Sequence, residues 1–323
     1  MSVKMRAGPG EGTRLHGGDH MKNQTTFKAA FMVMALVSTC AVFATGAGEE
    51  RKNGLSCQYE ELTAAQFTQA VEKASGTCLI PLGVMEKHGE HLPLGTDLIA
   101  CREEARLAAA QEYVLVFPPY YFSQIFEARH QPGTIAYSEK LIFDLLQETC
   151  AELARNGIKK IILFSGHGGN EHFLPYFCQA QLASRRDYAV YFFSPAEGPE
   201  DDPEVRKLLR TALDLHGGER ETSRMLAIAP QLVHLDLIKP GSGLDLMRLA
   251  ALPNAYTGIW WYASFPDHYA GDATPANAEL GRLLLQKKVK QLVELIRAVK
   301  RDKAVLQLQD EFYQRAERPV IPK

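Results

Sequence analysis

An apolar run at residues 79–85 is followed at once by side chains that can bind metal ions or protons. Because the run is short and carries no charge, it predicts a buried strand. The candidate ligands that follow it are Glu86, His88, His91 and Asp97. Glu86 and His88 lie two residues apart, so in an extended backbone their side chains point to one face. Carboxylate oxygens beside imidazole nitrogens favour a divalent metal ion.

Asp97 follows a bend in the chain that Gly89, Pro93 and Gly95 create. A carboxylate placed after such a turn offers two oxygens and can bridge two metal ions. The competing interpretation is a polar loop in which Asp97 caps a helix while Glu86 and the neighbouring lysine form a solvated pair. Residue types and spacing alone leave both interpretations open.

A second group of candidates follows the apolar stretch 159–164, which predicts another buried strand. Residues 165–170 read Ser-Gly-His-Gly-Gly-Asn, and the glycines allow close backbone approach and exposed amides. The lysine of a phosphate-binding loop does not follow, so we interpret His167 as a metal ligand or a base, with a structural turn as the alternative. Asn170 can donate a hydrogen bond to a substrate oxygen or cap the next helix.

The third group spans residues 216–223, which read His-Gly-Gly-Glu-Arg-Glu-Thr-Ser. His216 and two glycines precede a predicted helix, which places an imidazole beside free backbone donors. In the alternative, the segment is only a helix start, because Glu219 and Glu221 in a first turn are stabilised by the helix dipole. The chain has no Gly-x-Ser-x-Gly motif, which disfavours a serine hydrolase.

Strands and helices alternate along the chain in a way that indicates the fold class. The predicted strands are 79–85, 114–118, 159–164 and 188–194, and the predicted helices are 63–75, 98–112, 138–156, 173–185 and 277–305. This alternation predicts an α/β fold with a mainly parallel sheet. Right-handed crossovers bring the strand ends to one edge, where ligands bind. We therefore expect the loops that carry Glu86, His130 and His167 to meet at that edge.

Five motifs occur in a fixed order along the chain. They are Glu86-x-His88-Gly89 with Leu92-Pro93 and Thr96-Asp97, then Pro132-Gly133-Thr134-Ile135, Gly166-His167-Gly168-Gly169-Asn170, His216-Gly217-Gly218-Glu219-x-Glu221-Thr222-Ser223 and Gly271-Asp272-Ala273. This order resembles the creatininase (creatinine amidohydrolase) family over residues 60 to 300. Several separate motifs in one order are far more specific than any one of them.

The resemblance implies a three-layer α/β/α fold and a hydrolase that uses two divalent metal ions per chain, which can be zinc, manganese or iron. By the family pattern, Glu86 and His167 bind one ion and His88 binds the other. Asp97 bridges both ions, and His216 matches the residue that handles the substrate and its departing nitrogen. The resemblance also implies a homo-oligomer, with a hexamer as one arrangement.

Asn170 and Glu221 are also expected to take part in the hydrolysis. We expect Asn170, together with backbone amides, to hold the oxyanion of the reacting carbonyl. Glu221 is grouped with the catalytic residues, and the remaining metal ligand is either Glu221 or water. The proton on its way to the leaving nitrogen is carried by His216 or by a ligating carboxylate.

The sequence departs from creatininase itself at two places. Creatininase has a glutamate ligand two residues after the histidine of the third motif, and this chain has Gly169 there. The tryptophan that stacks on creatinine is not evident beside His216, since Trp260 and Trp261 lie far downstream and carry no assigned role. Creatinine is therefore not the expected substrate.

We accordingly expect an exported amidohydrolase that cleaves a carbon–nitrogen bond, other than a peptide bond, in a small cyclic amide or formamide. One alternative is a metal-dependent hydrolase or lyase that acts on a sugar-like or lactone substrate. Another is a non-catalytic periplasmic ligand-binding protein on the same fold. The complete ligand set of Glu86, His88, Asp97 and His167 favours an enzyme.

The N-terminal segment has the features of a secretory signal. Lys22 and Lys28 form a positive region, the sixteen residues 29–44 carry no charge, and small residues follow. Cleavage is expected after Ala44 or Ala47, which gives a periplasmic or secreted protein. A membrane anchor is the main alternative, but a spanning helix needs ~20 residues, so no stable membrane span is expected after cleavage. A lipoprotein signal ending at Cys40 is a further alternative.

Composition and cysteine spacing limit the remaining choices. The formal net charge of −2 shows no basic bias, which argues against nucleic acid and leaves a small molecule as the expected partner. The five cysteines beyond residue 48 are odd in number and form no Cys-x-x-Cys pair, so they are predicted to be buried thiols, with a Cys57–Cys78 disulfide as the alternative. The expected division is 1–48 as extension and signal, 49–310 as the hydrolase domain and 311–323 as a tail.

Overall fold

The computed structural model describes residues 54–195, 198 and 201–320. The expected signal segment, residues 1–48, lies outside the described residues. Within the described ranges, no helix combines the length and the apolar composition that crossing a membrane requires. The five cysteines found there carry free thiols, so the alternative Cys57–Cys78 disulfide is absent from this part of the chain.

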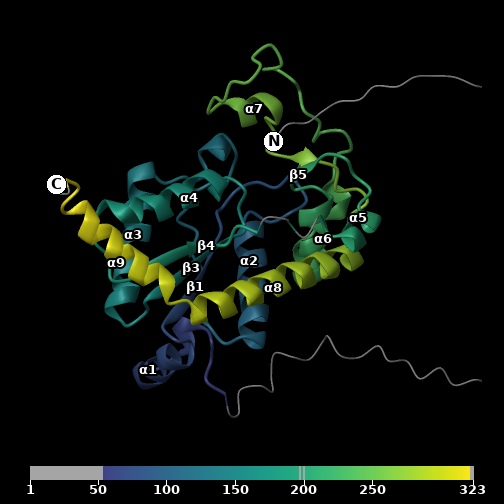
Figure 1. Ribbon diagram of the computed structural model, residues 1–323. Helices are drawn as coiled ribbons and strands as arrows, with labels where there is room; N and C mark the ends of the chain where they lie inside the picture. Colours follow the sequence, from purple (N-terminus) through teal and green to yellow (C-terminus); the bar gives the residue numbers. More distant parts are fainter. Residues whose placement is uncertain (1–53, 196–197, 199–200, 321–323) are drawn as a thin grey trace, which may run out of the picture. The chain divides into compact units, whose positions relative to one another are not determined.

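A four-stranded parallel sheet forms the centre of the fold (Figure 1). Its strands, in spatial order, are β2 (Leu115–Val116), β1 (Thr77–Leu82), β3 (Lys160–Ser165) and β4 (Ala189–Phe192). All six residues of β1 are buried, as the continuous apolar run predicts for a strand covered on both faces. Leu82 pairs with Ser165 across β1 and β3, so the two carboxyl ends lie side by side.

Helices cover both faces of this sheet, which confirms the three-layer α/β/α prediction. One face packs against α1 (Ala64–Lys73), α3 (Glu139–Arg155) and α4 (Asn170–Ala180). The other face packs against α2 (Thr96–Gln111) and α8 (Ala278–Arg301). Neighbouring residues of β1 point to opposite layers, since Ile80 belongs to the first core and Leu79 to the second.

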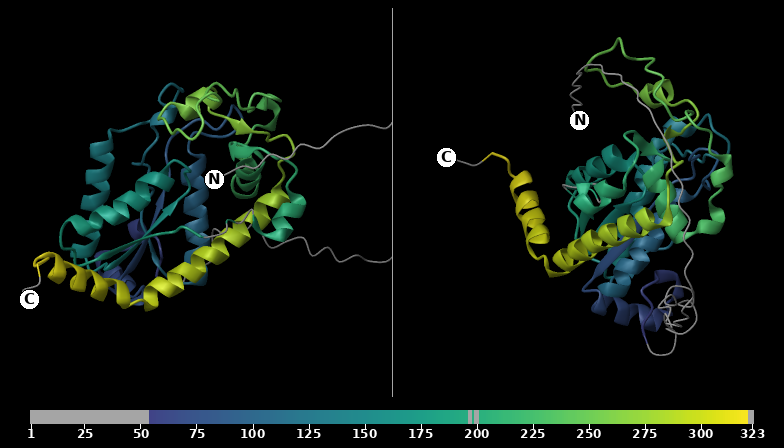
Figure 2. Two further views of the ribbon diagram at one scale, coloured as in Figure 1. Left: turned by 45° about the horizontal axis from the view of Figure 1, so that its top comes forward. Right: turned by 90° about the vertical axis from the view of Figure 1, so that its right-hand side faces the viewer.

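The predicted helix 277–305 corresponds to α8, which ends at Arg301, and an unpredicted helix follows it at an angle (Figure 2). Asp302 is extended and ends α8, and its carboxylate accepts from the amides of Ala304 and Val305 at the start of α9 (Ala304–Ala316). Residues 311–316, expected as part of a tail, therefore belong to α9. Tyr313 is buried there, and its hydroxyl donates to the Gln181 carbonyl oxygen.

A smaller set of elements lies beyond the carboxyl edge of the sheet. Strands β5 (Asp214–His216) and β6 (Ala270–Gly271) pair antiparallel. The accompanying helices are α5 (Pro203–Leu208), α6 (Glu219–Ile228) and α7 (Trp260–Ser264). The described 3₁₀ turns are η2 (Tyr59–Glu61), η3 (Phe126–Ala128), η4 (Gln181–Ala183), η6 (Pro230–Leu232) and η7 (Leu235–Leu237). Helix α6 packs on α8, which fixes residues 216–223 relative to the sheet.

Candidate metal centre and active site

Two strand ends and one helix start bring the first group of ligands together. Glu86 and His88 follow β1, and His167 follows β3. Asp97 is the second residue of α2, because this helix begins at Thr96 and not at the predicted residue 98. The backbone of Gly166 passes so close to α2 that an added Cβ would lie 2.5 Å from the Asp97 carbonyl oxygen. A glycine at this position therefore lets the His167 loop approach Asp97.

Glu86, Asp97 and His167 form one compact triad of buried side chains. His167 Nδ1 lies 2.8 Å from Glu86 Oε1 and 3.2 Å from Asp97 Oδ2. Both of these carboxylate oxygens are buried without a hydrogen-bond partner among the described residues. Unpartnered buried oxygens are rare and need an explanation. A divalent cation between them and the imidazole supplies one, so the triad fits a metal ion.

A second triad joins His88 and Glu221 to the other oxygen of Asp97. His88 Nε2 lies 3.0 Å from Asp97 Oδ1 and 3.9 Å from Glu221 Oε2. His88 Nδ1 lies 3.3 Å from the Glu86 carbonyl oxygen, to which it can donate, and this leaves the Nε2 lone pair free for a ligand. Asp97 thus directs one oxygen to each triad, which is the arrangement that a bridging ligand requires.

The buried carboxylates of the cluster stabilise positive charge on its histidines, and the histidines stabilise negative charge on Asp97. Burial lowers the pKa of His88, but Asp97, Glu86 and Glu221 outweigh it and raise that pKa to about 10. Burial also opposes charge on His167, and Glu86 and Asp97 nevertheless hold its pKa well above the usual range. Although burial raises the pKa of Asp97, the two histidines keep it well below its ordinary value.

His216 lies over this cluster with one ring nitrogen already engaged. Its Nε2 donates to the Lys87 carbonyl oxygen at 2.8 Å, and its ring centroid lies 4.2 Å from that of His88. Burial and the neighbouring His88 lower the pKa of His216, so the imidazole is neutral at pH 7. The nitrogen that remains free, Nδ1, lies 4.0 Å from Glu221 Oε2 and can accept a proton.

Asn170 is fully buried and has both amide atoms engaged. Its Nδ2 donates to Ser165 Oγ at 3.0 Å, and its Oδ1 accepts from Ser123 Oγ at 2.5 Å. These bonds tie the start of α4 to the end of β3, so they give Asn170 a role in holding the His167 loop. The second Nδ2 proton takes part in no described hydrogen bond, so the oxyanion role of Asn170 stays a prediction.

Two histidines near the motifs lie outside both triads. His91 Nε2 lies 2.9 Å from the Gly217 carbonyl oxygen and 2.9 Å from Thr222 Oγ1, so His91 joins the β1 exit loop to α6. Burial lowers the pKa of His91, which keeps it neutral in this role. His130 is exposed, and its Nε2 donates to the Pro266 carbonyl oxygen at 2.7 Å.

The structure adds residues that sequence reasoning missed. His268 is buried, and its Nε2 lies 2.5 Å from Glu86 Oε2. Trp261, which had no assigned role, donates its indole N–H to His268 Nδ1 at 2.8 Å and meets the His216 ring edge-on. Glu127 Oε1 lies 4.0 Å from His167 Nε2, and Gly169 leaves room for it. These residues follow no motif spacing, so only the folded chain identifies them.

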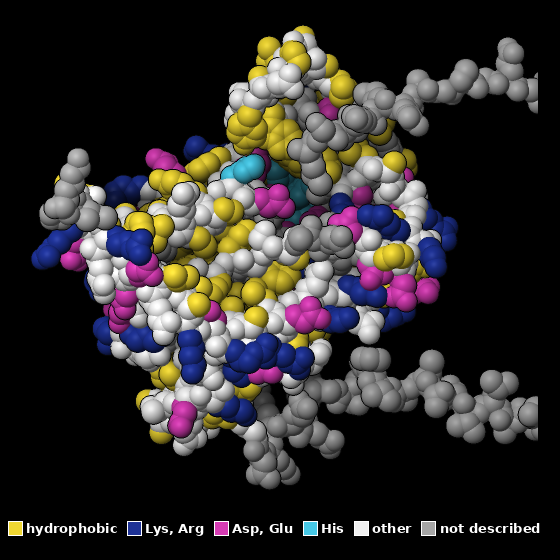
Figure 3. Space-filling view, in the orientation of Figure 1, with side chains coloured by type: hydrophobic (Ala, Val, Ile, Leu, Met, Phe, Trp, Pro, Cys, Tyr) yellow, Lys and Arg dark blue, Asp and Glu magenta, His cyan; other side chains and the backbone are white. Residues whose placement is uncertain are grey.

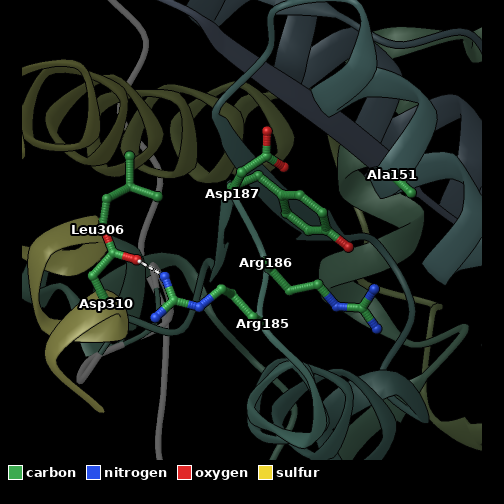
Figure 4. A pocket seen from close by; sticks show the side chains of 7 residues that line it. Ala151, Arg185, Arg186, Asp187, Leu306 and Asp310 are labelled. Atoms are coloured by element: carbon green, nitrogen blue, oxygen red, sulfur yellow. Dashed lines mark hydrogen bonds and ion pairs between the residues drawn. The ribbon is translucent and has the colours of Figure 1, made fainter. Parts of the chain in front are cut away.

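Histidine side chains lie in a hollow (Figure 3) that is separate from a large pocket among the described residues. Figure 3 shows histidine side chains in a hollow beside the mostly apolar surface at the top of the view. A pocket of about 580 Å³ lies elsewhere, at the start of β4, between α3 and α9 (Figure 4). Arg185 and Asp310 in its lining pair with each other at 3.0 Å. Because this pocket lies at the amino end of β4, it is not part of the cluster.

Sheet, layers and cluster together define a class of protein: an α/β/α protein with a candidate divalent-metal centre at the carboxyl ends of its strands. The family model described as creatininase, creatinine amidohydrolase, matches residues 60–296. The chain therefore belongs to the creatininase family. Family relatives include hydrolases of carbon–nitrogen bonds, creatinine amidohydrolase among them.

Individual relatives agree with this assignment. The chain is 27% identical over 192 residues to the creatinine amidohydrolase of Pseudomonas putida, covering 55% of this chain and 74% of that protein. It is 31% identical over 227 residues to the mycofactocin precursor peptide peptidase of Mycobacterium ulcerans, covering 68% and 83%. A creatininase crystal structure matches with a TM-score of 0.65 at 25% identity over 77% of this chain and 99% of that chain. Creatininase structures include a Zn–Zn form and a manganese form.

Proposed function

We propose that this protein is a dinuclear metal-dependent amidohydrolase that cleaves the carbon–nitrogen bond of a small cyclic amide or formamide. The observation that carries the proposal is the position of Asp97, whose two oxygens face two different histidines at 3.0 and 3.2 Å. Glu86, His167 and Asp97 would hold one ion; His88, Glu221 and Asp97 would hold the other. When bound, such ions supply a more acidic water and an electrophile for the carbonyl oxygen.

His216 is the residue placed for proton transfer. Hydrolysis adds water to the carbonyl carbon, breaks the carbon–nitrogen bond and requires a proton on the departing nitrogen. The neutral His216 ring has Nδ1 free and Nε2 held by the Lys87 carbonyl oxygen, so it can accept a proton from water and return it to the leaving nitrogen. His216 Nε2 lies 3.7 Å from Glu86 Oε2 and Nδ1 lies 4.0 Å from Glu221 Oε2, so the ring is near one carboxylate of each triad.

The size of the site favours a small reacting group. Glu86 and His88 are 1% and 0% exposed, so only a compact part of a substrate can reach them. Gly169 stands beside Gln124 and Glu127, whose tips line the room that a larger residue would fill. This lining differs from the liganding glutamate of creatininase and supports a substrate other than creatinine.

A peptide amide is the second candidate substrate. The identity to the M. ulcerans peptidase is 31%, and the match covers 83% of that protein. Many exposed apolar side chains lie in segment 232–262, which also carries Trp261 beside the cluster. Such a surface can hold the apolar residues of a short peptide outside the buried site.

Export and assembly complete the proposal. The positive region and uncharged stretch of residues 22–44 support cleavage after Ala44 or Ala47 and release outside the cytoplasm. We also infer a homo-oligomer from the family resemblance. N-terminal sequencing of protein recovered from the periplasm tests the first point, and an intact Met1 in the cytosol would contradict it. Sedimentation of the purified protein tests the second, and a monomer at micromolar concentration would contradict it.

The test of the activity is a substrate panel with controlled metal loading. Full-length protein is stripped with a chelator, reloaded with Zn²⁺, Mn²⁺ or Fe²⁺, and assayed on cyclic amides, N-formyl amines, short peptides and lactones. We expect release of an amine from a cyclic amide or N-formyl amine that stops on chelation and returns with metal. Asp144→Asn, which alters a surface Lys140 pair, is the matched control for a carboxylate change. Hydrolysis that is insensitive to chelation, or cleavage of lactones alone, contradicts the proposal.

A further inference from the structure

A hydrogen-bond chain outside the ligand set ends on Glu86. The Trp261 indole N–H donates to His268 Nδ1 at 2.8 Å, and His268 Nε2 lies 2.5 Å from Glu86 Oε2. His268 and Glu86 are each 1% exposed, so no bulk water competes for these bonds. The other Glu86 oxygen, Oε1, is the one that faces His167.

Trp261 determines which nitrogen of His268 carries the proton. An indole N–H is only a donor, so His268 Nδ1 must be the acceptor and the imidazole proton resides on Nε2. In that tautomer His268 donates to the carboxylate oxygen of Glu86. The other tautomer would place a lone pair against that carboxylate oxygen and leave the indole proton without an acceptor.

The backbone at His268 shows that this placement is imposed by the fold. His268 has φ +53°, a left-handed conformation that costs free energy for a residue with a side chain. Its amide donates to the Phe265 carbonyl oxygen at 3.0 Å, and its own carbonyl oxygen accepts from Gly89 at 3.4 Å. These bonds connect the end of α7 to the loop that carries Glu86 and His88, and they hold the ring toward the cluster.

We propose that Trp261 and His268 are positioning residues that fix the Glu86 carboxylate, so that Oε2 is held and Oε1 stays directed at the site shared with His167 and Asp97. The inference rests on the proposed function, because it concerns the orientation of a metal ligand. Outer partners of ligating side chains commonly contribute 10- to 100-fold to metal affinity. Here His268 orients the Glu86 carboxylate, and Trp261 orients His268.

The experiment measures Mn²⁺ affinity of the full-length, chelator-stripped protein from the free-ion electron paramagnetic resonance signal. His268→Phe keeps the ring shape but removes both nitrogens, and it is expected to weaken Mn²⁺ binding by roughly 10- to 100-fold. His268→Gln keeps a donor for Glu86 and is expected to bind within about threefold of wild type, well inside that range. Circular dichroism and melting temperature confirm that each variant is folded.

Two neighbouring tryptophans provide a matched pair for the second half of the proposal. Trp261→Phe retains an aromatic ring but loses the N–H that sets the tautomer, and it is expected to weaken Mn²⁺ binding by about tenfold, the lower end of the same range. Trp260→Phe is the control, because Trp260 is 39% exposed and is not part of the chain of bonds. Its Mn²⁺ affinity is expected to equal that of wild type.

The outcomes separate this inference from the proposed function. Unchanged affinity in folded His268→Phe overturns the positioning role, and equal losses in Trp260→Phe and Trp261→Phe overturn the tautomer argument. If His268→Phe does not fold, Trp261→Phe decides the question: a loss of about tenfold in Mn²⁺ affinity supports the positioning role, and unchanged affinity overturns it. A wild-type protein that binds no Mn²⁺ and no Zn²⁺ contradicts the metal-centre proposal itself.

Discussion

Replacing His216 by glutamine separates proton transfer from metal assembly. Glutamine retains an N–H that can reach the Lys87 carbonyl oxygen, which His216 Nε2 now contacts at 2.8 Å. It lacks a basic nitrogen, so the proton carrier is lost while the local hydrogen bond is preserved. General acid–base catalysis contributes typically 10²–10⁴-fold, which corresponds to about 3–5 kcal/mol of the activation barrier.

The stability cost of this change is expected to be small. The hydrogen bond to Lys87 contributes about 1 kcal/mol if lost, and glutamine is expected to keep most of it. His216→Ala removes that bond as well as the ring packing on His88, whose centroid lies 4.2 Å away. We therefore expect a lower melting temperature for His216→Ala than for His216→Gln, with the same loss of turnover in both.

Three measurements on the glutamine variant decide the role of His216. They are turnover of the best substrate, metal ions per chain by mass spectrometry, and melting temperature. The expected result is a large fall in kcat with wild-type metal content. Loss of an ion together with activity would show that His216 is a ligand in the group it forms with Glu86 and His88. Full activity with full metal content would refute the proton-transfer role.

Three further predictions follow from individual contacts. Glu221→Gln is expected to lower the affinity for one of the two ions, because Glu221 belongs to the His88 triad alone; two ions held at wild-type affinity would contradict this. Gly281→Ala would place a Cβ 1.8 Å from the Ser223 carbonyl oxygen and is expected to cost roughly 1–3 kcal/mol in urea unfolding, whereas Gly258→Ala, in open space, should cost less. Burial raises the pKa of the Cys150 thiol, so the folded protein keeps this proton at a pH where the unfolded chain loses it. The stability that the neutral buried thiol contributes is therefore complete below the unfolded-state pKa of about 8.5. Above that pH the free energy of unfolding falls by up to about 1.4 kcal/mol per pH unit. Cys150→Ala should flatten the fall in unfolding free energy between pH 8 and 10, and an unchanged slope would contradict this.

The parallel sheet and the primary ligands were predictable from the sequence because both depend on local patterns. Uninterrupted apolar runs indicate strands buried on two faces, and the candidate ligands follow two of these runs directly. Glu86, His88 and His167 therefore had to meet once the strands aligned, and β1 and β3 do lie side by side. Asp97 was identified as a ligand candidate, although it lies in the first turn of α2 rather than in a loop.

The remaining contacts could not be predicted because they join distant parts of the chain without a sequence period. His268 lies between α7 and β6 and contacts Glu86, which is 182 positions earlier in the chain. No local sequence pattern indicates this contact. Asn170 belongs to a motif, but its side chain accepts a hydrogen bond from Ser123, which lies 47 positions earlier. Helix α9 was not predicted, because the contact that buries it, between Tyr313 and Gln181, joins residues 132 positions apart.

The most direct test of the central claim is the number of metal ions that the protein holds with and without the Asp97 carboxylate. Asp97 directs Oδ1 to His88 and Oδ2 to His167, so Asp97→Asn keeps the shape of the side chain but removes the shared negative charge. Wild-type protein and the Asp144→Asn control, reloaded with Zn²⁺ or Mn²⁺, are expected to hold two ions per chain by mass spectrometry. Asp97→Asn is expected to hold fewer than two and to lose amide hydrolysis. Two tightly bound ions in folded Asp97→Asn would contradict the claim that this residue bridges a dinuclear centre.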